Sequence, residues 1–276
     1  MRSLDLLLCA TLTCLSATAS ADLAIETETA RMLKPGGSEL SVAGEYQSAE
    51  EGTEFAVPLF YEYGLTPTLE LLVEPTLFVG IYPDGERRTQ GLGDLEITGT
   101  WLLADEQEGR PATAIALEWK APTARNRAIG TRESDFALYL IGSKHIGDLE
   151  LHGHVAYTYI GKPTQQPMQP KTDVQNTWSV SLAGEYPLAT GWGVFAEATY
   201  TSAASESAEG DGASSNAQAE TRGSAETGSS SEIGGAESIG ILGVRYRFAP
   251  AASMFGSLSY DDSSAALLRL GMTFKF

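Results

Sequence analysis

Residues 268–276 read Leu-Arg-Leu-Gly-Met-Thr-Phe-Lys-Phe, and large apolar side chains occupy every second position of this stretch. Successive side chains of a β-strand point to opposite faces of the sheet, so the pattern predicts a strand with one apolar face. The other positions hold Arg269, Thr273 and Lys275, with Gly271 between them. The chain is therefore expected to finish in a strand that separates an apolar surrounding from a polar one.

The same two-residue period runs through most of the chain from residue 38 onward. Ile115, Leu117 and Trp119, for example, alternate with Glu118 and Lys120. A soluble β-sandwich shows the same alternation, so the pattern predicts an all-β protein without deciding between a sandwich and a barrel. Twelve segments carry it, at residues 40–47, 55–63, 69–81, 95–103, 115–120, 135–140, 149–159, 178–188, 192–201, 242–248, 254–260 and 268–276.

The lengths of the connections favour a barrel. Tight turns at residues 64–68, 145–148, 189–191 and 249–252 alternate with long polar loops at residues 82–93, 121–132, 162–175 and 202–238. Outer-membrane barrels have short turns at the periplasmic end and long loops at the outer end. We therefore predict a twelve-stranded, antiparallel, up-and-down transmembrane β-barrel over residues 38–276.

The apolar positions agree with a lipid-facing outer surface. Aromatic side chains such as Tyr46, Trp101, Trp178 and Trp192 fall near strand ends, where outer-membrane barrels carry two aromatic girdles. The rings of a sandwich core would be expected in mid-strand. The alternation also places Val79 and Ile81 on the outer face. The last strand looks like the insertion signal that barrel-assembly machinery reads, and its signal positions are Leu270, Met272, Phe274 and Phe276.

The first 21 residues carry the pattern of a secretory signal peptide. Arg2 precedes a short apolar run at residues 6–15, and Ala19-Ser20-Ala21 offers a small-residue cleavage site. A buried N-terminal helix is the alternative. Cleavage after residue 21 removes both cysteines of the chain, which suits an oxidising compartment. Residues 22–37 are then expected to form a periplasmic tail.

The charge of the chain is strongly negative. Thirty-six Asp and Glu residues against 18 Lys and Arg give a formal charge of −18, which excludes a nucleic-acid partner because phosphate binding needs a basic face. The loop at residues 202–238 is rich in Ser, Ala, Gly and Glu and is expected to be disordered. It is either a solvated insertion or a charged filter over the barrel mouth.

The inner face predicted by the alternation is charged. Acidic positions come from the first nine strands, and most basic positions come from the tenth and twelfth. Such a lumen is either an open pore that favours cations or a narrow interior filled by ion pairs. The candidate lumen residues are Glu45, Glu62, Glu70, Glu74, Glu96, Glu118, Lys120, Asp135, Glu150, His152, His154, Glu185, Glu197, Arg245, Arg247 and Arg269.

Catalytic and metal chemistry have little support in the sequence. Glu150, His152 and His154 share the inner face of one strand and are weak candidates for metal ligands. We expect the two histidines to be hydrogen-bonded lumen residues instead. No outward-facing serine pairs with an outward-facing histidine, as a lipid hydrolase would need. No GxSxG or zinc-spaced motif occurs. We expect no enzyme activity, no metal and no cofactor.

An ordered set of short motifs resembles one outer-membrane family. These are GLGDL at residues 91–95, EWKAPT at residues 118–123, ESDF at residues 133–136, KHIGDL at residues 144–149 and GVRYRF at residues 243–248. The resemblance is to the β-barrel family named "putative MetA-pathway of phenol degradation". It implies an outer-membrane barrel associated with aromatic or apolar compounds, and it carries no catalytic residues.

Together these features predict an outer-membrane channel, in a Gram-negative bacterium, through which small molecules pass passively. Its expected partners are outer-membrane lipid, the barrel-assembly machinery and a small-molecule solute. A structural or interaction barrel with a filled lumen is the main alternative. A secreted soluble β-protein is a third.

Overall fold

The computed structural model describes residues 25–85, 87–162, 174–204 and 236–276, and every regular element in them is a strand. Within these ranges no helix is long and apolar enough to cross a membrane. The strands are β1 (Ser38–Ala49), β2 (Gly52–Thr66), β3 (Leu69–Pro83), β4 (Thr89–Gly91), β5 (Leu95–Ala104), β6 (Ala112–Ala121), β7 (Asp135–Ile146), β8 (Leu149–Tyr159), β9 (Thr177–Pro187), β10 (Trp192–Thr201), β11 (Glu237–Ala249), β12 (Ala252–Asp261) and β13 (Ala266–Lys275).

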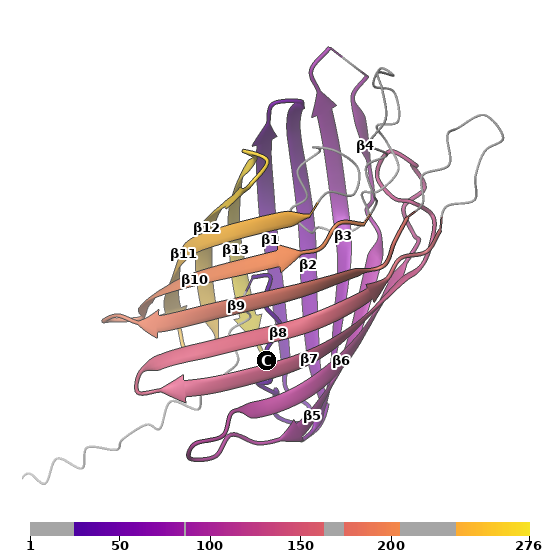
Figure 1. Cartoon of the computed structure of the whole chain (residues 1–276). Helices are drawn as coiled ribbons and strands as arrows, with labels where there is room; N and C mark the ends of the chain where they lie inside the picture. The colour runs from indigo at the N-terminus through magenta and orange to yellow at the C-terminus, as the bar shows by residue number, and fades with distance from the viewer. Residues whose placement is uncertain (1–24, 86, 163–173, 205–235) are drawn as a thin grey trace, which may run out of the picture.

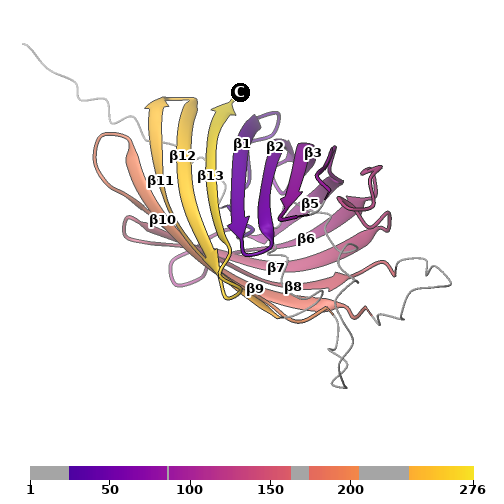
Figure 2. The ribbon, with the colours of Figure 1, turned by 90° about the horizontal axis from the view of Figure 1, so that it is seen from above.

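The strands form one closed antiparallel barrel (Figure 1). Each long strand pairs with its neighbours in the chain, and β1 closes the ring by pairing with β13, as the view from above shows (Figure 2). The short strand β4 pairs only with residues 79–81 of β3, whereas β5 pairs with residues 69–75. The wall therefore has twelve long strands, which confirms the predicted barrel, and β4 is an addition that the alternation did not indicate.

The two ends of the barrel differ as expected. At one end, here called the turn end, two residues join β2 to β3, β7 to β8, and β11 to β12. At the other end, the loop end, residues 122–134 join β6 to β7, and residues 202–236 join β10 to β11. The predicted loop at residues 202–238 falls largely in residues 205–235, outside the described residues. The predicted signal peptide, residues 1–21, lies outside them as well.

The outer face is apolar over the height of the wall. Leu117 is 58% exposed, Leu182 is 60% exposed and Leu242 is 70% exposed. A water-soluble protein rarely exposes so many large apolar side chains together, so this surface suits lipid. Aromatic pairs mark both ends, with Trp178 against Tyr200 at the loop end and Trp192 against Tyr246 at the turn end.

One strand departs from the predicted alternation. In the pairing of β2 with β3, Val57 faces Phe78 and Pro58 faces Thr76, which leaves Leu77 as an extra residue on β3. Such a β-bulge shifts the side chains beyond it to the opposite face. Val79 is consequently buried and packs with Ile81, Ala124 and Ile129 on the inside. The prediction that Val79 and Ile81 face outward was wrong for this reason.

Candidate functional site in the barrel lumen

Most of the sixteen candidate lumen residues lie on the inner face with little exposure. Glu45, Glu62, Glu70, Lys120, His152, His154, Glu197, Arg245 and Arg269 are buried, each at most 8% exposed. Glu74, Glu96, Glu118, Asp135, Glu150 and Glu185 are partly buried. Arg247 is exposed, because it lies near the end of β11, where a bulge between Arg247 and Ala249 disturbs the pairing with β12.

Bases on the inner face pair with acids of the adjacent strand or of the next strand but one. Arg269 on β13 donates from Nε to Glu45 on β1 at 2.6 Å. Arg245 on β11 lies 3.4 Å from Glu185 on β9, and Lys120 pairs with Asp135 across β6 and β7. These pairs lower the cost of burying charge in the wall.

Acidic side chains outnumber basic ones on the inner face of β2, β3, β5 and β6. Glu74 lies among the like charges of Glu96, Glu118 and Glu62. Glu62 in turn has Glu70 and Glu39 as like-charged neighbours. Carboxyl groups this close repel one another when they are ionised, and a nearby cation relieves that repulsion. The acidic side chains thus lie together on one side of the lumen, and the bases lie mainly on β11 and β13.

Arg245 is fixed between two aromatic rings. Its guanidinium carbon lies 5.7 Å from the ring centre of Phe195 and 5.8 Å from that of Phe255, which is cation–π distance on both sides. Phe195 lies against Gly243 of the neighbouring strand, where an added Cβ would come within 2.1 Å of the ring. The glycine leaves room for the ring, so that Phe195, Arg245 and Phe255 lie together on the inner face.

The largest departure from expectation concerns the segment before β1. Residues 22–37 were predicted to form a periplasmic tail, but residues 25–33 contact side chains of the inner wall and lie in the lumen. Glu70 and Glu150, which contact the segment, are each the second residue of their strands, next to the turns. His154 and Glu197 are each the sixth residue of theirs. Residues 25–33, here called the lumen segment, therefore rise from the turn end to mid-height.

Glu197 on β10 holds the inner end of the lumen segment. Its carboxylate accepts backbone N–H bonds from Ile25 at 2.5 Å, Glu26 at 2.9 Å and Thr27 at 3.0 Å. The carboxylate of Glu26 accepts a 2.7 Å bond from the guanidinium of Arg269. Hydrogen bonds to charged groups are stronger than neutral ones, so this end is well anchored.

Neutral side chains hold the middle of the segment. The backbone N–H of Glu28 donates to Nδ1 of His154 at 3.0 Å, and that of Ala30 donates to Oγ of Ser143 at 2.8 Å. A backbone N–H can only donate, so Nδ1 of His154 is the unprotonated ring nitrogen. Ser143 also bonds Nδ1 of His152 at 2.8 Å. Both histidines are thus engaged through Nδ1, as hydrogen-bonded lumen residues.

Small side chains on β6, β7 and β8 make room for the segment. Ala112, Ala114 and Ala116 face inward and are at most 2% exposed. Ala30 and the partly buried Met32 pack against this alanine surface, which Ala137 and Ala156 extend. Alanines at alternate inward positions are too small to fill the lumen, so their spacing in the sequence already indicated that another part of the chain packs against them.

Arg31 fastens the segment at the turn end. Its Nε lies 2.6 Å from Glu150, and its Nη2 lies 2.8 Å from Glu106 in the turn between β5 and β6. Lys144 and His145 also contact Glu106, both at 2.9 Å. Burial alone would raise the pKa of Glu106, but hydrogen bonds from His145, Lys144 and Arg31 outweigh burial and hold that pKa well below its ordinary value.

This low pKa predicts the pH dependence of the Glu106→Gln variant. A carboxyl group whose pKa is depressed by folding stabilises the folded state above its ordinary pKa of 4.5, and this stabilisation is lost as the pH falls through the depressed value. Glu106→Gln is therefore expected to unfold at lower urea concentration than wild type at pH 7, with the difference shrinking as the pH falls below 4.5. Equal midpoints at pH 7 would contradict the role given to Glu106.

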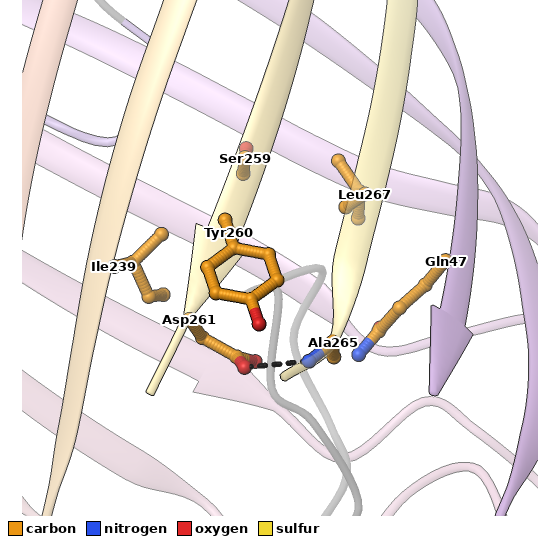
Figure 3. A pocket seen from close by; sticks show the side chains of 7 residues that line it. All are labelled: Gln47, Ile239, Ser259, Tyr260, Asp261, Ala265 and Leu267. Atoms are coloured by element: carbon orange, nitrogen blue, oxygen red, sulfur yellow. Dashed lines mark hydrogen bonds between the residues drawn. The ribbon is translucent and has the colours of Figure 1, made fainter. Parts of the chain in front are cut away.

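A small pocket lies at the loop end between β11, β12 and β13 (Figure 3). Asp261 shapes the hairpin beside it, because one carboxylate oxygen accepts N–H bonds from Ser263 and Ala265. The enclosed space suits about one water molecule. We therefore assign it to the structure of the hairpin and not to a solute. Its lining residues are Gln47, Ile239, Ser259, Tyr260, Asp261, Ala265 and Leu267.

Comparison with known proteins identifies the family. A family model described as "Putative MetA-pathway of phenol degradation" matches residues 42–226, about two thirds of the chain. The chain belongs to this family. No curated protein sequence matches it. The membership confirms the family that the motifs between residues 91 and 149 had suggested.

Solved structures share the fold at low sequence identity. The NanC porin is 12% identical with a TM-score of 0.59, and the match covers 86% of this chain and 100% of that chain. The KdgM porin in complex with disordered oligogalacturonate is 8% identical with a TM-score of 0.53, covering 86% of this chain and 99% of that chain. The family member therefore has the barrel fold of outer-membrane porins.

Proposed function

We propose that this family member is an outer-membrane channel for the passive passage of small molecules. The observation that carries the proposal is the contrast between the two faces of one closed wall. The outer face exposes Leu117 and Leu182, whereas the inner face buries Glu62, Arg245 and Arg269. Such a wall isolates a polar interior from lipid. The family description refers to phenol degradation, so small aromatic compounds are the first solutes to test.

The proposed orientation places the turn end in the periplasm of a Gram-negative bacterium. The long connections then face outward, as in other barrels of this membrane. The proposal includes export by a signal peptide cleaved after residue 21 and insertion by assembly machinery that recognises the C-terminal strand. Leu270 and Phe276, which are 58% and 76% exposed, supply the apolar face of that strand.

The acidic wall predicts a preference for cations. Replacing Glu62 and Glu74 together by glutamine removes two of the clustered carboxyl groups with little change of shape. The ratio of cation to anion permeability in a planar bilayer is expected to fall roughly twofold or more. Glu50→Gln, in the exposed turn between β1 and β2, is the matched control and should leave the ratio unchanged. An unchanged ratio in the double variant would contradict the role of the wall.

A structural barrel with a filled lumen is the second candidate. The lumen segment favours it, because residues 25–33 and their partners occupy space that a solute would need. A structural barrel would insert into lipid and fold normally but would pass no solute at any size.

Swelling of proteoliposomes distinguishes the two candidates. The mature chain is reconstituted, and liposomes are diluted into isotonic solutions of solutes of increasing size, beginning with glycerol, with phenol uptake followed by absorbance. A channel gives swelling rates that fall with solute size. Rates equal to those of protein-free liposomes for every solute, from a barrel with the heat-shifted gel mobility of the folded state, would overturn the proposed function.

A further inference from the structure

The lumen segment is held by side chains of the wall and not by strand pairing. Its backbone N–H groups donate to Glu197, His154, Ser143 and Glu70, and residues 25–33 form no strand. Water can replace each of these acceptors, because a hydrogen bond to water compensates for most of the bond that is lost. Only Ala30 and Met32 pack in the apolar cluster. A segment bound in this way can leave without breaking the sheet.

The wall that receives the segment has the features of a groove for an extended peptide. Inward alanines on β6 provide depth, and acceptors at successive heights on β7, β8, β9 and β10 meet successive positions of the segment. Thr27, for example, places Oγ1 2.6 Å from Oγ of Ser181 on β9. Glu150 and Glu106 receive Arg31 at the turn end. The groove thus binds the backbone N–H groups of an extended peptide and one basic side chain.

A close approach at the turn end completes the groove. An added Cβ at Gly64, near the end of β2, would lie 2.4 Å from the carbonyl oxygen of Lys34 and 2.9 Å from that of Leu33. Gly36 and Gly64 are joined by a 2.8 Å backbone bond. The absence of a side chain at Gly64 is therefore what allows the chain to turn from β1 into the lumen at this level.

We propose that the inner wall from β6 to β10 is a binding site for an extended peptide, occupied by the chain's own residues 25–34 as a displaceable plug that sets the size of the passage. The gating part of this proposal rests on the proposed channel function. The binding part does not, because it concerns only the groove and its occupant.

A reversible cross-link tests the plug in the full mature chain. Thr27→Cys with Ser181→Cys places two sulfur atoms where the hydroxyl oxygens now lie 2.6 Å apart. The mature chain contains no other cysteine. Oxidation is expected to form the disulfide quantitatively, as shown by loss of maleimide labelling. Conductance in a planar bilayer should rise at least threefold on reduction of the disulfide, whereas each single-cysteine variant should not respond.

Failure of the disulfide to form in the folded barrel would overturn the binding site. A disulfide that forms, with the same conductance above zero before and after reduction, would overturn gating and leave the channel function intact. If neither the oxidised nor the reduced protein conducts, the channel function is overturned. Maleimide labelling would still show whether the segment occupies the groove.

A displaced plug provides a readout that does not depend on conduction. Gly64→Val should push the chain away at Lys34, so that Cys at position 27 reacts with a water-soluble maleimide at least five times faster than in the otherwise wild-type protein. Gly99→Val on β5 is the matched control, because an added Cβ there meets nothing within 4 Å. Equal labelling rates in the Gly64→Val and Gly99→Val proteins would contradict a displaceable segment.

A synthetic peptide tests the ligand class directly. The peptide with the sequence of residues 25–34, labelled with a fluorophore, is expected to bind the Gly64→Val barrel with higher anisotropy than a scrambled peptide of the same composition. Replacing Arg31 in the peptide by alanine should weaken binding at least tenfold, because the guanidinium contacts to Glu150 and Glu106 are then lost. Equal binding of the three peptides would overturn the groove as a specific site.

Discussion

Leu117→Arg is expected to abolish assembly of the barrel. Leu117 is the sixth of ten residues in β6 and is 58% exposed on the outer face, so the new charge would meet lipid at mid-depth. An arginine there costs about 2–4 kcal/mol in outer-membrane barrels. Leu182→Arg on β9 should behave in the same way, because Leu182 is 60% exposed. The measurement is the fraction of protein with heat-shifted gel mobility after refolding in lipid.

A second leucine on the neighbouring strand supplies the control. Leu103 is 56% exposed but is the ninth of the ten residues of β5, near the turn end. Near the membrane surface the cost of arginine falls to about 0–1 kcal/mol, so Leu103→Arg should assemble. Normal assembly of Leu117→Arg, or equal failure of both variants, would show that the outer face has been placed wrongly in the membrane.

Arg269→Met is expected to lower the free energy of unfolding by about 3–5 kcal/mol, the usual cost of breaking a buried ion pair by removing one partner. Arg269 is 3% exposed and contacts Glu45 at 2.6 Å and Glu26 at 2.7 Å. Methionine keeps the apolar stem but leaves both carboxylates without this cation. The measurement is the urea midpoint of the refolded barrel, followed by tryptophan fluorescence.

Neutralising Glu45 and Glu26 tests whether the loss of stability comes from their unpaired charge. In the variant Arg269→Met with Glu45→Gln and Glu26→Gln, the two side chains that contact Arg269 no longer carry charge, and most of the lost stability should return. Persistence of the full loss in the triple variant would assign the effect to packing around Arg269. An unchanged midpoint in Arg269→Met alone would show that the ion pair does not hold the lumen segment to the wall.

The strands of the barrel wall could be predicted from the sequence because their two faces lie in different surroundings. Lipid outside and polar groups inside impose alternation on each strand, so Leu117 and Glu118 already indicated opposite faces. The pairing of particular charges could not be predicted in this way. That Arg269 meets Glu45 follows from the register of β1 on β13, which alternation does not specify.

Two features, the bulge in β3 and the lumen segment, leave no alternating pattern in the sequence from which they could be predicted. The bulge at Leu77 depends on the fit between β2 and β3, including Pro58, and it reverses Val79 and Ile81 without a change in their own pattern. The lumen segment has no alternation because it belongs to no sheet, and Glu197, its main anchor, is 170 residues away from Thr27 in the chain. The inward alanines of β6 were the available sign that the lumen holds a second component.

The reversal potential of the mature chain in a planar bilayer with a KCl gradient tests the central claim most directly. A lumen with the acidic wall around Glu62 and Glu74 predicts steady conductance and a reversal potential of the sign that cation selectivity gives. A folded barrel that conducts no ions, or one that selects anions, would contradict the account of this protein as a cation-preferring passage.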